Sequence, residues 1–285
     1  MGKLKEILKN TLIGIAPNSY FYLLYLRYRH RWPDFKHPKD LSEIVMSDVM
    51  YHRIEQYAPY TDKVGVRKYI EDWGLGECLP KLYGVWNSVD DIDFDSLPDK
   101  FALKTNHGSG DHQFCHGKAS FDFEKAKEAL RPVLARTYGG RLEPHYALIP
   151  PKVFAEELLE QPGETQPVDY KFMCCDGEVK FILYVAERGT TMGAKFNVYT
   201  SDWKKLNYRR GADASHKDVP APPADVLKRM VDIAEFIAKK FEHVRVDFYA
   251  IGSKIYIGEL TFTPAGVLAS FTNEAVDVAG HRERK

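Results

Sequence analysis

The chain has 285 residues, with 44% hydrophobic and 28% charged side chains, and its 40 basic and 40 acidic residues give a formal net charge of zero. This composition is that of an ordinary folded protein, so it excludes a disordered chain, a coiled coil and a collagen. The neutral balance also argues against a dedicated nucleic-acid binder, which would carry a basic excess.

Residues 1–40 predict a helical N-terminal extension. Apolar side chains recur at helical spacing over 3–12, and basic residues follow over 27–31. A basic amphipathic segment of this kind can lie on an anionic membrane surface, or it can pack on the body of the protein or on a partner subunit. Both interpretations stay open at this point.

The same region bears on where the protein is located. The apolar stretch 11–26 is interrupted by Pro17, Asn18 and Ser19, and it is shorter than the roughly 20 residues that a spanning helix needs. The four cysteines form no C-x-x-C pair, which favours inert thiols in a reducing compartment. We therefore expect a cytoplasmic protein, either free or at the inner face of the membrane.

Residues 41–100 predict two helices and a strand. The stretches 41–58 and 62–73 have the apolar spacing of helices, and glycines at 74 and 76 favour the end of the second one. The run 79–85 predicts a strand, and an acidic loop follows it.

Residues 101–285 predict strands and helices with hairpins toward the C-terminus. The strongest local signal is Asp176–Gly177, because this dipeptide favours the tight turn of a β-hairpin. A second hairpin is expected at Gly252–Ser253. The other expected elements are strands over 101–105, 152–160 and 195–199 and helices over 122–138 and 225–241. Because no parallel strand–helix–strand repeat is evident, the sequence predicts an α+β fold with antiparallel strands.

Lys104 stands near the end of an expected strand and precedes a small loop that contains His107, Gly108, Ser109 and Gly110. Glycines let backbone N–H groups approach a phosphate closely, and the lysine adds a positive charge. The order is the reverse of a Walker A loop, in which the lysine follows the glycines. The segment therefore predicts either a phosphate-binding loop or an ordinary turn after a strand.

Arg245, Asp247 and Glu259 interrupt the apolar runs of two neighbouring strands. Charged side chains that face a core are costly unless they are paired or bound to a metal. Two carboxylates on adjacent strands can hold Mg²⁺ together with phosphate oxygens. An arginine–carboxylate salt bridge on the sheet face accounts for the same residues equally well.

Two weaker patterns accompany these residues. Glu156 and Glu157 follow a strand, and Lys171 alternates with apolar neighbours, so all three either contact a nucleotide or face solvent. The loop Asp90–Asp95 contains the D-x-D pattern twice. Glycosyltransferases that use nucleotide sugars often hold a metal with such a pair, and a solvated acidic loop is the alternative.

The order of these segments resembles that of an ATP-grasp enzyme, more specifically of the teichuronopeptide-biosynthesis (TupA-like) family. The segments that carry the resemblance are FALKTNHGSG (101–110), PVDYKFMCCDGEVKFI (167–182), VRVDFY (244–249) and IYIGELTFTPAG (255–266). TDKVGVRKYIEDWG (61–74) and IDFDSLPDKFALK (92–104) also match the family's style.

The resemblance implies an ATP-grasp fold, in which the nucleotide lies between two antiparallel sheets and Mg²⁺ lies at its phosphates. It divides the chain into a helical extension over 1–40, an N-terminal subdomain over 41–100 and an ATP-grasp domain over 101–285. Asp247 and Glu259 are then the expected metal ligands. Ligases that resemble this end of the chain have E-x-N at the metal, whereas Thr261 follows Glu259 here, and a threonine hydroxyl is a weaker, neutral ligand.

The resemblance also assigns the remaining site residues. Lys104 and Lys171 would contact ATP, and Arg245 would face the transferred phosphoryl group, so these three are the expected catalytic residues. The other expected ATP-binding residues are His107, Gly108, Ser109, Gly110, Glu156 and Glu157. The loop among them would cover the phosphates, and the two glutamates would lie at the adenine–ribose hinge.

The activity that the resemblance implies is ATP- and Mg²⁺-dependent ligation of a carboxylate to an amine through an acylphosphate. The carboxylate is expected to belong to a uronic acid or a similar sugar of a surface polysaccharide. Two alternatives stay open, a glycosyltransferase of polysaccharide biosynthesis and an ATP-grasp phosphotransferase with a hydroxyl acceptor. The expected partners are ATP, a carboxylate-bearing saccharide and an amine, with no nucleic acid.

Overall fold

The structure of the protein is a computed structural model. It describes residues 17–108, 110, 112–164, 166–187, 194–206, 218–265 and 267. In these residues the strands form a four-stranded sheet, in the order β1-β4-β2-β3, and a six-stranded sheet, in the order β10-β9-β5-β6-β7-β8. Every pairing between these strands is antiparallel. The expected α+β class with two antiparallel sheets is therefore confirmed.

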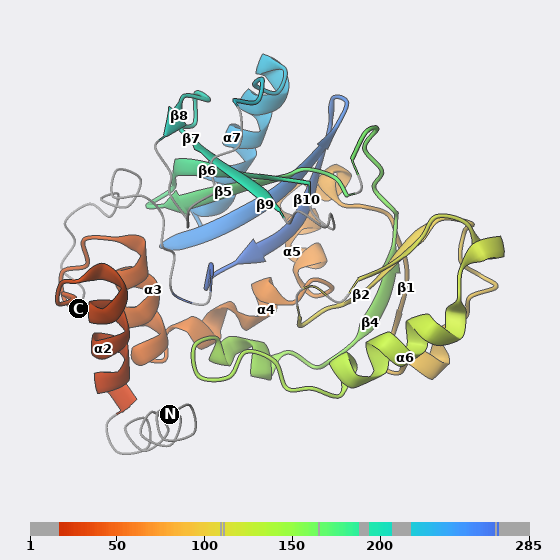
Figure 1. Cartoon of the computed structure of the whole chain (residues 1–285), viewed down its shortest axis with the longest axis horizontal. Helices are drawn as coiled ribbons and strands as arrows, with labels where there is room; N and C mark the ends of the chain where they lie inside the picture. The colour runs from red at the N-terminus through yellow and green to blue at the C-terminus, as the bar shows by residue number, and fades with distance from the viewer. Residues whose placement is uncertain are drawn as a thin grey trace.

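The small sheet consists of β1 (Leu82–Trp86), β2 (Phe101–Thr105), β3 (Gln113–Cys115) and β4 (Val153–Glu156). The large sheet consists of β5 (Asp169–Cys175), β6 (Glu178–Ala186), β7 (Lys195–Tyr199), β8 (Lys205–Leu206), β9 (His243–Ile251) and β10 (Lys254–Thr261). The α-helices are α2 (Pro17–Arg29), α3 (Leu41–Met50), α4 (Ala58–Thr61), α5 (Val66–Asp72), α6 (Phe123–Leu134) and α7 (Ala224–Ala238). The 3-10 helices are η1 (Ile54–Tyr57), η2 (Gly76–Cys78), η3 (Val89–Asp91), η4 (Lys118–Ser120) and η5 (Pro144–Leu148). Figure 1 shows the two sheets side by side, with α7 on the outer side of the large sheet and α6 on the outer side of the small one.

Both expected hairpins form. Asp176 and Gly177 join β5 to β6 with φ values of 56° and 80°. Positive φ at both central residues is the geometry that suits the twist of paired strands, and glycine adopts it without a steric cost. The turn at Gly252–Ser253 joins β9 to β10 in the same antiparallel manner.

The long helix expected over 41–58 is divided into shorter elements. Asp40 caps the start of α3 by accepting a hydrogen bond from the backbone N–H of Glu43 at 2.9 Å. His52 has a φ of 58° just after α3, and this left-handed conformation cannot continue an α-helix. The chain then resumes as η1 and α4.

Alternation along β9 separates a side that packs in the hydrophobic core from a side that carries charged residues. In β9, Val244, Val246 and Phe248 are fully buried and join the same core cluster as the buried side of α7. The intervening residues, among them Arg245 and Asp247, point to the other face. The small sheet follows the same rule, because its outer residues form a core with α6 while Lys104 points inward.

β1 belongs to the region expected as a separate subdomain over 41–100. It pairs with β4, which comes from the region over 101–285. The small sheet is therefore built across the expected boundary at residue 100.

The described part of the extension is held by buried charges. Tyr25 on α2 donates a hydrogen bond to Asp40 at 2.5 Å, and Arg31 contacts both Asp40 and Glu43, at 2.9 and 2.6 Å. Both carboxylates are almost completely buried, so these contacts fix α2 on α3. The helix expected over 3–12 lies outside the described residues. None of the helices in the described ranges has the length and apolar character needed to cross a bilayer.

Candidate functional site

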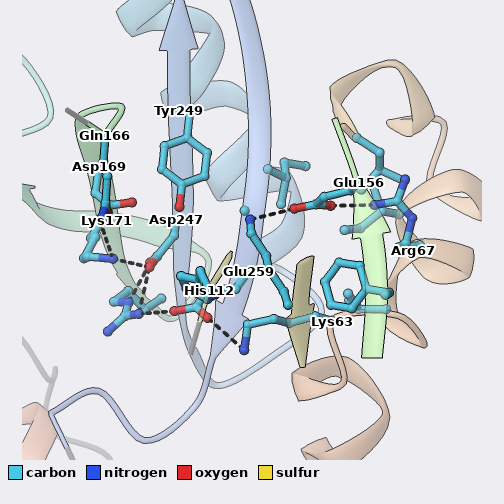
Figure 2. A pocket seen from close by; sticks show the side chains of 18 of the residues that line it. Lys63, Arg67, His112, Glu156, Gln166, Asp169, Lys171, Asp247, Tyr249 and Glu259 are labelled. Carbon is cyan, nitrogen blue, oxygen red and sulfur yellow. Dashed lines mark hydrogen bonds and ion pairs between the residues drawn. The ribbon is translucent and has the colours of Figure 1, made fainter. Parts of the chain in front are cut away.

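A cavity of about 430 Å³ lies between the inner faces of the two sheets. Its volume falls in the range of roughly 300–1,000 Å³ that is common for small-molecule sites. The charged side chains that line it are Lys63, Arg67, Lys104, Lys171, Arg245, Glu156, Asp169, Asp247 and Glu259. In Figure 2, Asp169, Lys171, Asp247 and Glu259 of the large sheet face Glu156 of the small sheet and Arg67 of α5.

Strand register places three charged residues in one row on the large sheet. Lys171 on β5 lies opposite Asp247 on β9, and Asp247 lies opposite Glu259 on β10. Directly paired residues point to the same face of a sheet. Three side chains that are 76 and 12 positions apart in the chain therefore meet at the cavity wall.

A β-bulge at Gly258 is what turns Glu259 toward the cavity. Ile257 pairs with Phe248, but Glu259 pairs with Asp247, so the register shifts by one residue between them. Without the extra residue, Glu259 would share the core face with Ile257. Glycine fits here without displacing its neighbour, because a Cβ on residue 258 would lie 2.8 Å from the ring of Tyr249 and would force that ring to move. Because of the bulge, Glu259 faces the cavity although its neighbours along the strand are apolar.

Arg245 lies between the two carboxylates of the row. Its guanidinium donates hydrogen bonds to both Asp247 oxygens at 2.6 and 2.7 Å and to Glu259 Oε1 at 2.6 Å. Lys171 Nζ lies 2.5 Å from Asp247 Oδ2 and 3.2 Å from Asp169 Oδ2. The arginine–carboxylate salt bridge expected from the sequence is therefore present. The two carboxylates are also adjacent, as a shared metal ion would require.

The pKa values of the two carboxyl groups shift in opposite directions. Burial raises the pKa of Asp247, and Arg245 and Lys171 oppose that rise. Burial alone would also raise the pKa of Glu259, but Lys63, Arg245 and Lys171 outweigh it and hold the pKa well below its ordinary value. Glu259 is therefore a carboxylate across the physiological pH range.

The opposite wall presents cations that are held by Glu156. Lys104 Nζ lies 2.6 Å from Glu156 Oε1, and Arg67 lies 3.4 Å from Glu156 Oε2. Arg67 also donates a hydrogen bond to the carbonyl of Pro80. Glu156 is 7% exposed, so its charge is used to fix two cations that point into the cavity.

Lys63 contacts both walls. Its ammonium donates to the carbonyl of Gly108 at 2.6 Å and lies 3.4 Å from Glu259 Oε2 on the large sheet. The side chain is only 10% exposed. Figure 2 shows Lys63 extending from the α5 side to Glu259.

The loop residues after Lys104 lie in different places. Gly110 lines the cavity, and Gly108 contributes its carbonyl to Lys63. His107 is buried away from the cavity, where its ring nitrogens contact Asn106 Oδ1 and the carbonyl of Arg136, both at 3.3 Å. Ser109 lies outside the described residues.

Glu157 begins the connection between the two sheets. Its carboxylate accepts hydrogen bonds from the backbone N–H of Lys81 at 3.3 Å and from the hydroxyl of Tyr256 at 3.5 Å. It lines a small recess next to the main cavity rather than the cavity itself. The two expected hinge residues therefore differ, since Glu156 faces the cations and Glu157 faces the recess.

The structure adds Lys63, Arg67 and Asp169 to the residues that the sequence singles out. Lys63 lies in the turn before α5, and Arg67 lies in the first turn of that helix. The apolar positions of the same segment predict the helix, but nothing in their pattern distinguishes its cations from those of a solvated face. Asp169 stands two residues before Lys171 on β5 and therefore shares its face.

The D-x-D loop lies away from the cavity. Asp91, Asp93 and Asp95 are exposed, and none of them lines it. Asp93 Oδ1 accepts hydrogen bonds from the backbone N–H groups of Asp95 and Ser96, at 3.1 and 3.3 Å, as turn residues do. The feature that favoured a glycosyltransferase therefore belongs to a surface turn.

The donor set of the cavity fits Mg²⁺ that arrives with a phosphate. Among the described residues, no three histidine, cysteine or carboxylate side chains gather as a complete protein metal site. Mg²⁺ commonly takes one or two carboxylates and completes its shell with water and substrate phosphates. Asp247 and Glu259 supply such a pair, and the Thr261 hydroxyl lies beside it, 3.2 Å from Glu259 Oε1.

Comparison with known families gives one match over most of the chain. Residues 43–280 match the family described as TupA-like ATPgrasp. None of the curated proteins matches the sequence.

Solved structures give more distant likenesses. D-alanine–D-alanine ligase from Bacillus anthracis complexed with ATP has 16% identity and a TM-score of 0.46, over 74% of this chain and 57% of that one. L-amino acid ligase from Bacillus licheniformis has 8% identity and a TM-score of 0.49, over 90% and 58%. The ATP-grasp ligase PsnB, complexed with a precursor variant, Mg and ADP, has 12% identity and a TM-score of 0.43, over 81% and 63%. The chain thus spans about three fifths of the length of these structures, and likeness at this level carries no argument about activity.

Proposed function

The chain belongs to the TupA-like ATP-grasp family, and we propose that it is an ATP- and Mg²⁺-dependent ligase that joins a carboxylate to an amine through an acylphosphate. The observation that carries the proposal is the pair Asp247 and Glu259, bridged by Arg245 and flanked by Lys171. These groups face Lys104 on the other wall of a cavity large enough for a nucleotide.

The first step needs cations around a phosphoryl group. A carboxylate oxygen of the substrate attacks the γ-phosphorus of ATP, the bond to the β-phosphate oxygen breaks, and ADP leaves. Arg245, Lys171 and Lys104 are the residues to which we assign stabilisation of the charge on the phosphoryl oxygens. Asp247 and Glu259 would hold Mg²⁺, which supplies further neutralisation of that charge when bound.

The second step forms the amide. The amine attacks the carbonyl carbon of the acylphosphate, the carbon–oxygen bond to phosphate breaks, and the amine gives up a proton. Water would hydrolyse the same intermediate, so the enzyme must exclude it. The position of the cavity between two sheets supports this role.

The family resemblance supports a uronic acid or a similar sugar of a surface polysaccharide as the carboxylate, and we propose that the enzyme works in the cytoplasm, where ATP is supplied. A phosphotransferase on the same fold differs only in its acceptor. It would transfer the phosphoryl group to a hydroxyl and stop there.

Product analysis tests the proposal. The protein is incubated with ATP, Mg²⁺ and paired panels of uronates and amines, and products are identified by mass spectrometry. We expect a condensation product, with ADP and phosphate formed only when both substrates are present. A phosphorylated sugar without free phosphate would instead establish the phosphotransferase, and turnover of a nucleotide sugar without ATP would establish a glycosyltransferase.

We further propose that the N-terminal extension contacts an anionic membrane. Residues 1–40 contain eight lysines and arginines and three acids, a net charge of +5 in a chain whose total is zero. Within the described part of this segment, the acid Asp40 is buried, while Trp32 and Tyr28 are 63% and 51% exposed. Exposed aromatic and basic side chains together favour the interface of an anionic bilayer.

Vesicle binding tests this contact. We expect the protein to sediment with vesicles that contain phosphatidylglycerol and to remain in solution with pure phosphatidylcholine. Exchange of the exposed cations Arg27, Lys36 and Lys39 for glutamate should abolish sedimentation. The matched control exchanges Lys68, Lys204 and Lys228, which are 74–79% exposed on other elements. Equal loss in both triple variants, or no sedimentation of the wild type, would refute the contact.

A further inference from the structure

Lys63 is held in place by the small-sheet side of the cavity. Its backbone N–H donates to the carbonyl of Asn106 at 3.1 Å, and the preceding Asp62 accepts from Asn106 Nδ2 at 2.9 Å. Asn106 is fully buried, and its Oδ1 accepts a hydrogen bond from the backbone N–H of Lys152 at 2.7 Å. The base of the Lys63 side chain is therefore fixed relative to the Gly108 carbonyl that its ammonium binds.

The far end of Lys63 occupies one oxygen of a proposed metal ligand. It lies 3.4 Å from Glu259 Oε2, while Arg245 takes Glu259 Oε1. Lys171 and Arg245 hold Asp247 in the same way. Three protein cations thus contact two carboxylates, and a metal ion that binds these oxygens has to replace them.

We propose that Lys63 competes with the metal ion for Glu259, and that this competition makes metal binding depend on bound nucleotide. Metal alone would displace Lys63, whose side chain is only 10% exposed, and would leave its ammonium without a counter-ion beside a dication. Nucleotide phosphates offer the displaced ammonium a new partner. The inference rests on the metal site of the proposed function and assigns a regulation to that site.

The charge of the cavity supports the same conclusion. Its lining has five lysines and arginines and four carboxylates, a net charge of +1. A divalent metal alone raises this charge to +3 in a partly desolvated space, which is unfavourable. A complex of the metal with a nucleoside triphosphate is a net dianion and changes the charge to −1. The net charge of the cavity is therefore close to zero both without ligands and with metal and nucleotide bound together.

The experiment compares binding of Mn²⁺, an EPR-visible substitute for Mg²⁺, with and without ADP. We expect wild-type protein to bind Mn²⁺ weakly alone and more tightly with ADP. Lys63→Met should bind Mn²⁺ alone about tenfold more tightly than wild type, within the 5–150-fold range common for coupling between sites. Because Lys63 no longer competes for Glu259, the gain in Mn²⁺ affinity from ADP should shrink in this variant, and the gain in ADP affinity from Mn²⁺ should shrink equally.

Two further variants separate competition at Glu259 from a general change of charge. Lys68→Met removes an exposed lysine next to the same helix turn and should leave Mn²⁺ binding unchanged. Lys104→Met removes a cation from the same cavity that pairs with Glu156 instead. The inference would be overturned if Lys104→Met and Lys63→Met gained equally in affinity for Mn²⁺ alone, or if Lys63→Met gained none. Binding of Mn²⁺ in the presence of ADP would in either case still support the metal site. Absence of Mn²⁺ binding even with ADP would refute the metal site, and this inference with it.

Discussion

Asp247→Asn is expected to lower kcat/KM for ATP-dependent ligation on the order of 10³-fold, equivalent to about 4 kcal/mol of transition-state stabilisation. The substitution keeps the size of the side chain but removes its charge. Asp247 contacts both Arg245 and Lys171 and lies directly opposite Glu259. An asparagine cannot serve as the second carboxylate of the pair, and both cations lose their shared counter-ion.

Asp169→Asn provides the matched control for this prediction. Asp169 is also buried, also lines the cavity and also contacts Lys171, at 3.2 Å. It does not pair with β10, so we assign it no part in holding a metal. We expect a much smaller loss of kcat/KM in this variant, with thermal unfolding used to confirm that both proteins are folded. Equal losses would mean that the charge around Lys171 matters and the pair Asp247–Glu259 does not.

Arg245→Met is expected to destabilise the ligand-free protein by about 3–5 kcal/mol, the usual cost of breaking a buried ion pair by removing one partner. Arg245 is 14% exposed, and its guanidinium holds Asp247 and Glu259 together. Without it, two adjacent carboxylates repel each other with little access to water. Urea unfolding at neutral pH measures the free energy of unfolding directly.

Two comparisons show whether the loss arises from this charge pair. Arg229→Met breaks an ion pair with Glu77 in which both side chains are at least half exposed, so its cost should stay below about 1 kcal/mol. Adding Asp247→Asn to Arg245→Met removes one of the repelling carboxylates and should restore part of the stability. This role of Arg245 would be contradicted if the two arginine variants unfolded at the same urea concentration. It would also be contradicted if adding Asp247→Asn lowered the free energy of unfolding further.

Local signals in the sequence are sufficient to predict most of the fold. The turn at Asp176–Gly177 depends on the preferences of two adjacent residues, so β5 and β6 can be expected from the sequence alone. The two antiparallel sheets follow from such hairpins and from the family resemblance, and both are confirmed. Arg245 and Asp247 can be placed on one face because strand alternation is itself local.

Residues whose position depends on distant parts of the chain are harder to predict. The bulge at Gly258 reverses the face on which Glu259 lies, and simple alternation from Ile257 would put that carboxylate in the core. Lys63 gains its role only because Gly108 and Glu259 come close to it from 45 and 196 positions away in the chain.

Glu156 shows the same dependence on distant contacts. The family resemblance assigns it to the nucleotide hinge, yet its carboxylate contacts Lys104 and Arg67. These two contacts depend on sheet pairing and on the packing of α5. Because neither is encoded in the residues next to Glu156, a pattern along the chain cannot predict them.

In the proposed reaction, a carboxylate is activated by phosphorylation before an amine attacks it. The most direct test uses a carboxylate substrate labelled with ¹⁸O in both carboxyl oxygens, together with unlabelled ATP and the amine. We predict that each released phosphate contains one ¹⁸O atom, because the carbon–oxygen bond of the acylphosphate breaks in the second step. Turnover of ATP to unlabelled phosphate while the amide forms would contradict the claim.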